Sequence, residues 1–324
     1  MTLAGACLLS WLWAGCGSDT PSGSTGQDAS TQDGSTGHDT GSKPQPTTPG
    51  PMRLVSWNVH NFYDDVRDTC GGCPYEDVVT TSKYTAKIRD VAQVLAQLDG
   101  DVVLLQEVEN EAVLDALATS ATLAPKGYVT RKLLFGNDPR GINIGLLSRT
   151  PVDRYISHKD DRFTRTDAPA YVYRFTRDAV EVHMTYRGHH VALVGVHFKA
   201  RSDDDDPDRR VAEAQRARAI ADEILRADPE AYVVLLGDFN DTPGTESYTW
   251  ALDGADGPTF GQALASIPAD QRYTYIYDNQ RLLIDHLLAS PNADGRLVDG
   301  TPMILQVARQ ASDHAAIAAT YTVP

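Results

Sequence analysis

Short apolar segments that end in polar residues recur along the chain. Five of them are rich in β-branched side chains and predict strands: MRLVSWNVHNFYDD (52–65), DVVLLQEVEN (101–110), VALVGVHFKAR (191–201), YVVLLGDFND (232–241) and RLLIDHLLAS (281–290). An uninterrupted apolar run such as 233–236 is typical of a strand that is buried on both faces. The polar groups that follow these runs are therefore expected at the rim of a sheet.

Two other segments repeat apolar side chains at helical spacing. They are residues 83–98 and the alanine-rich segment 207–227. Helical patterns that alternate with strand patterns predict an α/β fold. The sequence Tyr-Arg-Gly-His at 186–189 lies between two strand-like segments and is typical of a hairpin turn. Because a hairpin adds antiparallel pairing, the sheets are expected to be mixed.

The first 51 residues differ in composition from the rest. Residues 3–14 form an apolar run of twelve that leads to Trp-Ala-Gly-Cys, and no side chain before Asp19 is charged. This pattern predicts a lipoprotein-type signal at 1–16 with Cys16 as the lipidated residue, although Trp13 stands where such signals usually have leucine. An ordinary secretory signal is the alternative. Both predict an exported protein, at the cell surface or extracellular.

Residues 17–51 form the expected linker and residues 52–324 the expected catalytic domain. Between 18 and 51, 28 of 34 residues are Ser, Thr, Gly, Pro or Asp, and such a segment buries too little apolar surface to fold. Cys70 and Cys73 are the only cysteines after residue 51. In an exported chain we expect them to form a small loop disulfide rather than a redox or metal pair, because a four-ligand zinc site would need a second pair of cysteines.

The net charge limits the classes of partner. With 29 Lys+Arg against 44 Asp+Glu, the chain carries a formal charge of −15. This excludes nucleic-acid binding through bulk positive charge, but it leaves room for a local basic cleft. No stretch of 18 or more apolar residues lies within the body of the chain, so a polytopic membrane protein is excluded.

Polar residues that could take part in catalysis or metal binding lie next to the predicted strands. A turn, a helix cap or a solvated strand end would explain any one of them alone, but together they predict a site. Oxygen-rich donors with few sulphurs suit Mg²⁺, Mn²⁺ or Ca²⁺ rather than structural zinc. These candidates, each placed directly after an apolar strand, are Asn58, Glu107, His197, Asp238, Asn240, Asp285, Asp313 and His314.

The motifs SWNVHNF, LLQEVEN, RGINIGLLSR, VHFKAR, LLGDFND, LIDHLLAS and SDHAA follow one another in this order. In this order they resemble the endonuclease/exonuclease/phosphatase superfamily. The sequence around these motifs is similar to that of bacterial extracellular nucleases. The resemblance covers nearly all of 52–324. It implies a four-layered α/β sandwich in which two mixed sheets pack face to face, helices lie outside and the site lies at one end.

The resemblance also implies roles for individual residues. Asn58 and Glu107 match metal-binding positions, and Asp313 matches a further ligand or its neighbour. Asp238 and Asn240 match the pair that orients the nucleophilic water and holds the phosphate. His197 matches the residue that contacts the scissile phosphate. Asp285 and His314 match the charged pair of the site.

Phosphodiester hydrolysis explains these residue types chemically. It requires a cation on the phosphate, a deprotonated water and stabilisation of the leaving group. Mg²⁺ needs only one or two protein carboxylates, so Glu107 suffices as its main ligand. His314 would act as a base if Asp285 accepted its ring N–H, and Asp238 is the competing candidate for the base.

Basic residues next to the site are candidates for phosphate binding. Arg140 could form a bidentate contact, and Lys199 is expected on the same side of its strand as His197. For Arg177 and Arg201 a surface role is equally consistent with the pattern.

We therefore expect an exported, monomeric, metal-dependent endonuclease acting on DNA, with RNA as the alternative nucleic-acid substrate. A lipid or small-molecule phosphodiesterase is the alternative within the superfamily. A lipid enzyme should expose a hairpin with adjacent large apolar residues, and none is recognised in the sequence. The Trp-Cys-Asp-Arg signature of inositol-polyphosphate phosphatases is absent as well, since 283–286 reads Leu-Ile-Asp-His. An inactive binding module is disfavoured because the set of polar candidates is complete.

Overall fold

The computed structural model describes residues 50–67, 75, 77–201 and 205–324. The signal, most of the linker, Cys16, Cys70 and Cys73 lie outside the described residues. None of the helices in the described ranges combines the length and apolar character that a membrane crossing requires.

Six strands form the first sheet. β1 pairs in parallel with β2, and the other neighbours pair antiparallel, so the sheet is mixed. In spatial order the strands are β13 (Met303–Leu305), β14 (Ala316–Val323), β1 (Gly50–Phe62), β2 (Val102–Val108), β4 (Asn143–Ser148) and β3 (Thr130–Leu133).

A second mixed sheet also has six strands. Its parallel pair is β7 with β8, and the remaining pairs are antiparallel. In spatial order the strands are β5 (Arg154–Ser157), β6 (Ala179–Tyr186), β7 (His189–His197), β8 (Tyr232–Asp238), β12 (Asp285–Ala289) and β9 (Gly261–Gln262).

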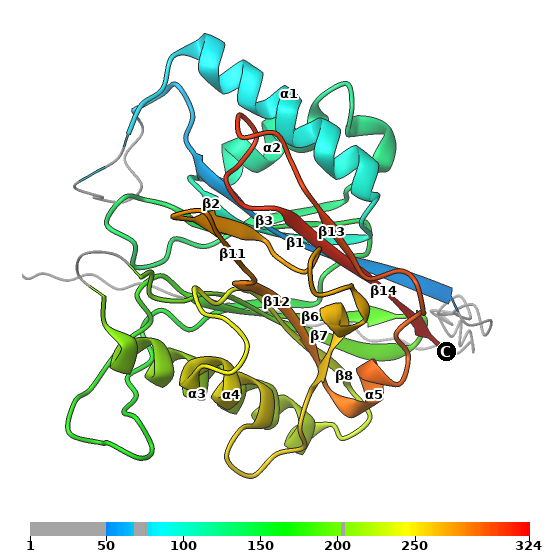
Figure 1. Cartoon of the computed structure of the whole chain (residues 1–324). Helices are drawn as coiled ribbons and strands as arrows, with labels where there is room; N and C mark the ends of the chain where they lie inside the picture. The colour runs from blue at the N-terminus through cyan, green and yellow to red at the C-terminus, as the bar shows by residue number, and fades with distance from the viewer. Residues whose placement is uncertain (1–49, 68–74, 76, 202–204) are drawn as a thin grey trace, which may run out of the picture. The chain divides into compact units, whose positions relative to one another are not determined.

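Helices cover the outer face of each sheet (Figure 1). α1 (Thr81–Leu98) and α2 (Glu111–Thr119) pack on the first sheet, and α3 (Pro207–Ala227) and α4 (Glu246–Asp253) pack on the second. The remaining elements are short: the 3₁₀ turns Ala124–Lys126 and Ala263–Ser266, the helix α5 (Pro291–Asp294), and a two-stranded hairpin of β10 (Tyr275–Tyr277) and β11 (Gln280–Leu282).

Alternation along the strands divides the apolar residues into three layers. Leu54 and Leu104 face the space between the sheets, where they meet Leu236 of the second sheet. Their neighbours Val55 and Val103 point the other way and pack under α1 and α2. Because successive side chains of a strand point to opposite faces, strands with apolar residues at every position can fill both layers. The expected α/β sandwich of two mixed sheets is confirmed.

Local patterns predicted several elements closely. The segment 207–227 coincides with α3, and α1 begins two residues before the expected 83, where the Thr80 side chain accepts a hydrogen bond from the Lys83 backbone N–H. The hairpin joins β6 and β7, with positive φ at both Arg187 and Gly188. A two-residue turn of this kind matches the twist of the strands it connects. β1 begins at Gly50, two residues before the expected start of the domain.

The prediction of one strand over 281–290 is wrong. β11 ends at Leu282, and β12 begins only at Asp285. Asp285 therefore opens a strand instead of closing one. Asp313 and His314 likewise precede β14. These three residues nevertheless belong to the same rim, because the amino ends of antiparallel strands lie beside the carboxyl ends of their neighbours.

Gly237 allows the close approach of β7 and β8 next to that rim. Its φ is 140°, and a Cβ atom placed on it would lie 2.0 Å from the Val196 carbonyl oxygen. A side chain there would have to push the backbone of β7 away. The glycine that precedes Asp238 is therefore required by the pairing of the two strands.

We expect Gly237→Ala to lower the free energy of unfolding by about 1–3 kcal/mol more than a positive φ alone would, because the clash is with backbone and no rotamer relieves it. Gly127→Ala is the matched control: Gly127 also has a positive φ, of 70°, but nothing lies within 4 Å of its Cβ position. It should cost about 1 kcal/mol. Chemical denaturation measures both, and equal losses would contradict the argument from the clash.

Candidate active site

Three predicted residues of the second sheet meet at one rim. β7 and β8 run in parallel and end in register, with His197 paired to Asp238. β12 runs the opposite way, and its first residue, Asp285, pairs with Asp238. All three side chains are buried. The rim therefore carries two carboxyl groups and an imidazole within one strand width of each other.

The first sheet contributes Asn58 and Glu107 across from this rim. The pairing of β1 with β2 shifts register between Asn58 and Phe62, and Asn61 and Glu107 take positive φ values there. The Asn61 backbone N–H then donates to Glu107 Oε2 at 2.7 Å. Asn58 Nδ2 lies 3.4 Å from Glu107 Oε1 and 2.9 Å from Asp238 Oδ2. Its amide therefore links the two sheets.

His314 is held from several sides before β14 begins. Its backbone N–H donates to Ser312 Oγ at 3.0 Å, and its carbonyl accepts from the Trp57 indole at 3.0 Å. Ser312 Oγ in turn donates to the Asn58 carbonyl at 2.7 Å. These bonds connect the segment before β14 to β1 and fix the position of the His314 ring.

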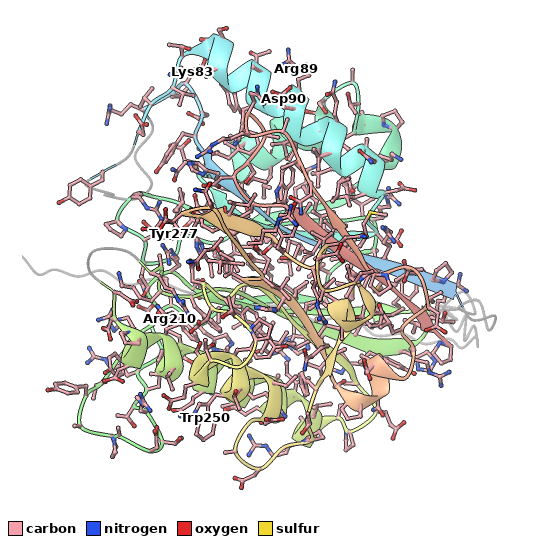
Figure 2. The ribbon with its side chains drawn as sticks, viewed as in Figure 1. Lys83, Arg89, Asp90, Arg210, Trp250 and Tyr277 are labelled. Atoms are coloured by element: carbon pink, nitrogen blue, oxygen red, sulfur yellow. The ribbon has the colours of Figure 1, made fainter. Side chains whose placement is uncertain are left out.

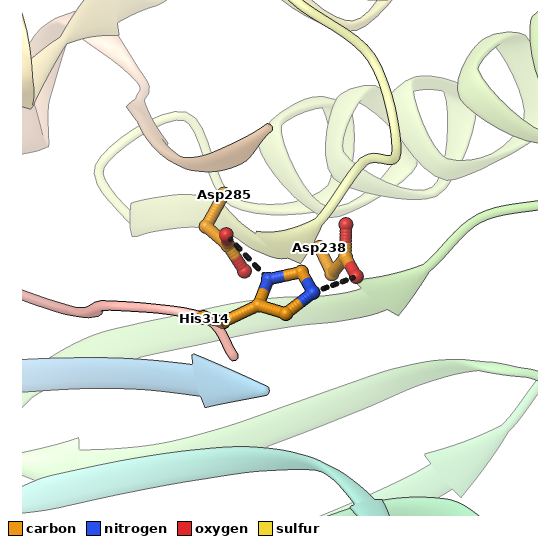
Figure 3. Close-up of side chains that lie close together, drawn as sticks. All are labelled: Asp238, Asp285 and His314. Atoms are coloured by element: carbon orange, nitrogen blue, oxygen red, sulfur yellow. Dashed lines mark hydrogen bonds and ion pairs between the residues drawn. The ribbon is translucent and has the colours of Figure 1, made fainter. Parts of the chain in front are cut away.

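The His314 ring lies between two carboxylates (Figure 3). Nδ1 is 2.9 Å from Asp285 Oδ2, and Nε2 is 3.8 Å from Asp238 Oδ2. Burial lowers the pKa of His314, but Asp285 and Asp238 outweigh burial and raise it to about 10. His314 is thus an imidazolium at neutral pH. Burial and the nearby Asp285 raise the pKa of Asp238, and the charge of His314 opposes them only in part.

His197 has the opposite electrostatic character. Its Nε2 lies 3.5 Å from Asp238 Oδ2 and 3.8 Å from Glu107 Oε1. Burial, followed by the positive charges of Arg177 and Arg140, holds the pKa of His197 well below its usual range. The site therefore pairs a neutral imidazole with a charged one.

Two arginines, Arg140 and Arg177, also line the site. Asp138 holds both: Arg140 Nη2 lies 2.9 Å from its Oδ2, and Arg177 Nε lies 3.0 Å from the same atom. Burial raises the pKa of Asp138, but the two guanidinium groups outweigh it and lower that pKa. The sequence analysis missed Asp138, although an acid two residues before Arg140 is a signal that could have identified it.

A cleft of about 540 Å³ opens between these groups. Asn240, another predicted site residue, has a positive φ, and its backbone N–H donates to Asp238 Oδ1 at 2.8 Å. Arg177 and Arg201 also line the cleft. The predicted site residues that line it are Asn58, Glu107, Arg140, His197, Asp238, Asn240, Asp313 and His314.

Two predicted residues do not line the cleft. Asp285 is completely buried behind His314 and acts through it. Lys199 is buried as well, and its backbone N–H donates to Glu213 Oε2 at 2.6 Å. The prediction that Lys199 faces the site beside His197 is wrong, because β7 ends at His197 and the strand alternation stops there.

The donor atoms fit a hard divalent cation. Glu107 and Asp313 bring carboxylates into the cleft beside Asn58, and Mg²⁺ takes one or two carboxylates while it keeps several waters. Asp313 pairs with His60 Nδ1 at 2.6 Å. A second buried group of donors, Asp238, Asp285 and His314, has ligand atoms within 4.8 Å of one another. There the protonated His314 already supplies the positive charge.

The Lys87 side chain links two backbone segments next to these carboxylates, a role that the sequence did not reveal. Its Nζ donates to the carbonyls of His60, at 3.1 Å, and Ala311, at 2.7 Å. Burial lowers the pKa of Lys87 to about 8, and Asp313 and Glu107 oppose this only in part. The ammonium therefore joins the β1 bulge to the segment before β14.

Comparison with known proteins identifies the family. A profile described as the Endonuclease/Exonuclease/phosphatase family matches residues 54–307. The chain belongs to this family. Its members hydrolyse phosphoester bonds. No curated protein matches the sequence.

Solved structures of this family share the fold. Truncated Caenorhabditis elegans TDP2 aligns with a TM-score of 0.56 at 19% identity, over 84% of this chain and 98% of that chain. D. rerio TDP2 complexed with a single strand DNA product gives 0.54 at 18% identity, over 84% and 99%. The human nocturnin catalytic domain with a bound sulfate anion gives 0.54 at 15% identity, over 84% and 95%.

The charge of His314 is testable in the protein treated with EDTA. Its folded pKa of about 10 lies above the ordinary 6.5, so its proton stabilises the fold fully below pH 6.5, and this stability is lost as the pH rises through 10. In Asp285→Asn the pKa should fall towards 6.5, because the closest carboxylate is removed. Titration of the ring signals by NMR measures the shift, with Asp153→Asn as the control. An unchanged pKa in Asp285→Asn would refute the pairing.

Proposed function

We propose that this protein is a metal-dependent nuclease that hydrolyses the phosphodiester backbone of DNA, with RNA as a second substrate. The observation that carries the proposal is the buried array of Asp285, His314 and Asp238 facing Glu107 and two arginines across one cleft. This array combines a proton acceptor, a cation and carboxylate ligands, which are the groups that phosphodiester hydrolysis requires. The single strand DNA product in D. rerio TDP2 supports a nucleic-acid substrate.

The protonation states divide the work among the residues. Asp238 serves as the base that accepts the proton of the attacking water, since its raised pKa brings it nearer to neutral pH. His314 then acts as a fixed positive charge next to the phosphate, oriented by Asp285. A divalent cation held by Glu107 and Asp313, beside Asn58, would neutralise charge on the phosphate. Neutral His197 and the amide of Asn240 position phosphate oxygens.

The N-terminal sequence supports a location outside the cytoplasm. We propose that the signal at 1–16 exports the chain and that a lipid on Cys16 holds it at the surface. The linker up to residue 51 would then give a monomeric catalytic domain reach away from the membrane. Apart from that lipid, the proposal needs no membrane contact.

A lipid phosphodiesterase is the second candidate, and one observation favours it. The sequence analysis recognised no loop with adjacent large apolar residues, and this is wrong. Ile276 and Tyr277 are 55% and 66% exposed, and Tyr171 and Val172 are 68% and 64% exposed. Exposed neighbouring apolar side chains are typical of surfaces that contact lipid or other partners. The two functions must therefore be separated by assay.

The purified chain should cleave plasmid DNA with Mg²⁺ or Mn²⁺ and should lose this activity in EDTA. The reason is that carboxylate oxygens hold the cation, whose double charge on the phosphate adds to the charges of the arginines and of His314. Parallel assays with RNA, sphingomyelin and inositol phosphates, each with Mg²⁺, Mn²⁺ or Ca²⁺, compare the alternatives. Undiminished DNA cleavage in EDTA would exclude the metal, and turnover of sphingomyelin alone would establish the lipid enzyme.

Substitutions in the buried array should reduce kcat in a fixed order. Asp238→Asn removes the base and should cost about 10²–10⁴-fold, with His314→Ala in the same range. Asp285→Asn should cost less, because it acts only through His314. KM should change little, since these groups act in the transition state. Asp153→Asn, outside the cleft, is the control. A His314→Ala variant that is folded and keeps more than about a tenth of kcat contradicts the assignment.

A further inference from the structure

Residues of the hairpin of β10 and β11 form one wall of the cleft. Figure 1 labels β11 of this hairpin. Tyr275 pairs with Leu282 and Tyr277 pairs with Gln280 across the hairpin, and all four residues line the cleft. Ile276 pairs with Arg281 between them, and neither of these two lines it. Because side chains alternate along a strand, the hairpin has an aromatic cleft face and a separate outer face.

The aromatic face begins at the catalytic imidazole. The Tyr275 ring lies with its centroid 4.8 Å from that of His314 and is tilted by 39°. Tyr277 lies two residues further along the strand, about 7 Å away. Its side chain is 66% exposed, and Figure 2 labels it on this hairpin.

We propose that Tyr277 stacks on an unpaired nucleobase next to the scissile phosphate, which makes single-stranded nucleic acid the preferred substrate. This inference rests on the proposed nuclease function. The arginines that line the cleft take the backbone phosphates, and the tyrosine takes a base. In a duplex both faces of a base are covered by its neighbours, so only an unpaired base can use this wall. Stacking tolerates any sequence, because every base has a π-face.

A bilayer is the competing occupant of the same hairpin. Its apolar exposure is confined to Ile276 and Tyr277, and the turn and strand that follow, 278–281, read Asp-Asn-Gln-Arg. The polar surroundings and the orientation of Tyr277 into the cleft therefore favour a base.

Binding of the full chain to fluorescent oligonucleotides tests the proposal separately from hydrolysis. The assay measures anisotropy at low salt in EDTA, with a single strand and with an abasic strand of equal length. Wild type should bind the base-bearing strand about 5- to 150-fold more tightly. Tyr277→Ala should abolish this difference, Tyr277→Phe should keep it, and Ile276→Ala on the outer face should leave it unchanged. Equal affinities in wild type, including no measurable binding of either strand, would overturn the proposal.

Cleavage assays with Mg²⁺ then compare a single strand with the same sequence in a duplex. The single strand should give the higher kcat/KM in wild type, and Tyr277→Ala should reduce this preference. Cleavage of nucleic acid without any dependence on Tyr277 would refute the stacking but leave the nuclease intact. Base-dependent binding without cleavage would refute the nuclease alone. Tyr277-dependent binding to phosphatidylcholine–sphingomyelin vesicles, with no discrimination between the two strands, would assign the hairpin to lipid instead.

Discussion

Two polar contacts between the sheets determine the chemistry of this protein. Asn58 beside Asp238 and His314 beside Asp285 each join the first sheet or its flank to the second sheet. Burying a charge costs several kcal/mol unless a partner compensates it. In each contact, one residue buried without its partner would therefore destabilise the fold. The apolar side chains that fill the rest of the space between the sheets set their separation. The site is therefore assembled by the same packing that closes the fold.

Features that depend on neighbouring residues could be predicted from the sequence. The helix at 207–227, the turn at Arg187 and Gly188, and the buried strand at 233–236 follow from periodicity and turn chemistry. The ends of the parallel strands β7 and β8 were predictable as well, since an apolar run that stops at a polar residue places that residue at a rim. Membership of the family followed from motifs in these same segments.

Features that depend on distant parts of the chain were not predictable. The sequence does not reveal that β12 runs antiparallel to β8, so Asp285 was placed at the wrong end of a strand. Lys199 was assigned to the site because nothing in its neighbourhood shows that the alternation stops at His197. The charge of His314 depends on two carboxylates that are distant in sequence. The aromatic wall was missed because its alternating tyrosines were not read as a hairpin.

Backbone conformation at the cleft has a further consequence. Among the described residues, four of the non-glycine residues with positive φ line the cleft: His60, Asn61, Glu107 and Asn240. A positive φ costs about 1–2 kcal/mol for a residue such as Glu107 and less for asparagine and histidine, and the surrounding packing must offset this cost. For protein engineering, glycine at these positions would relax the chain and raise thermal tolerance, but the side chains that the strained backbone aims would be lost. Thermostability and the precise placement of the cleft side chains therefore compete within the same few residues of this protein.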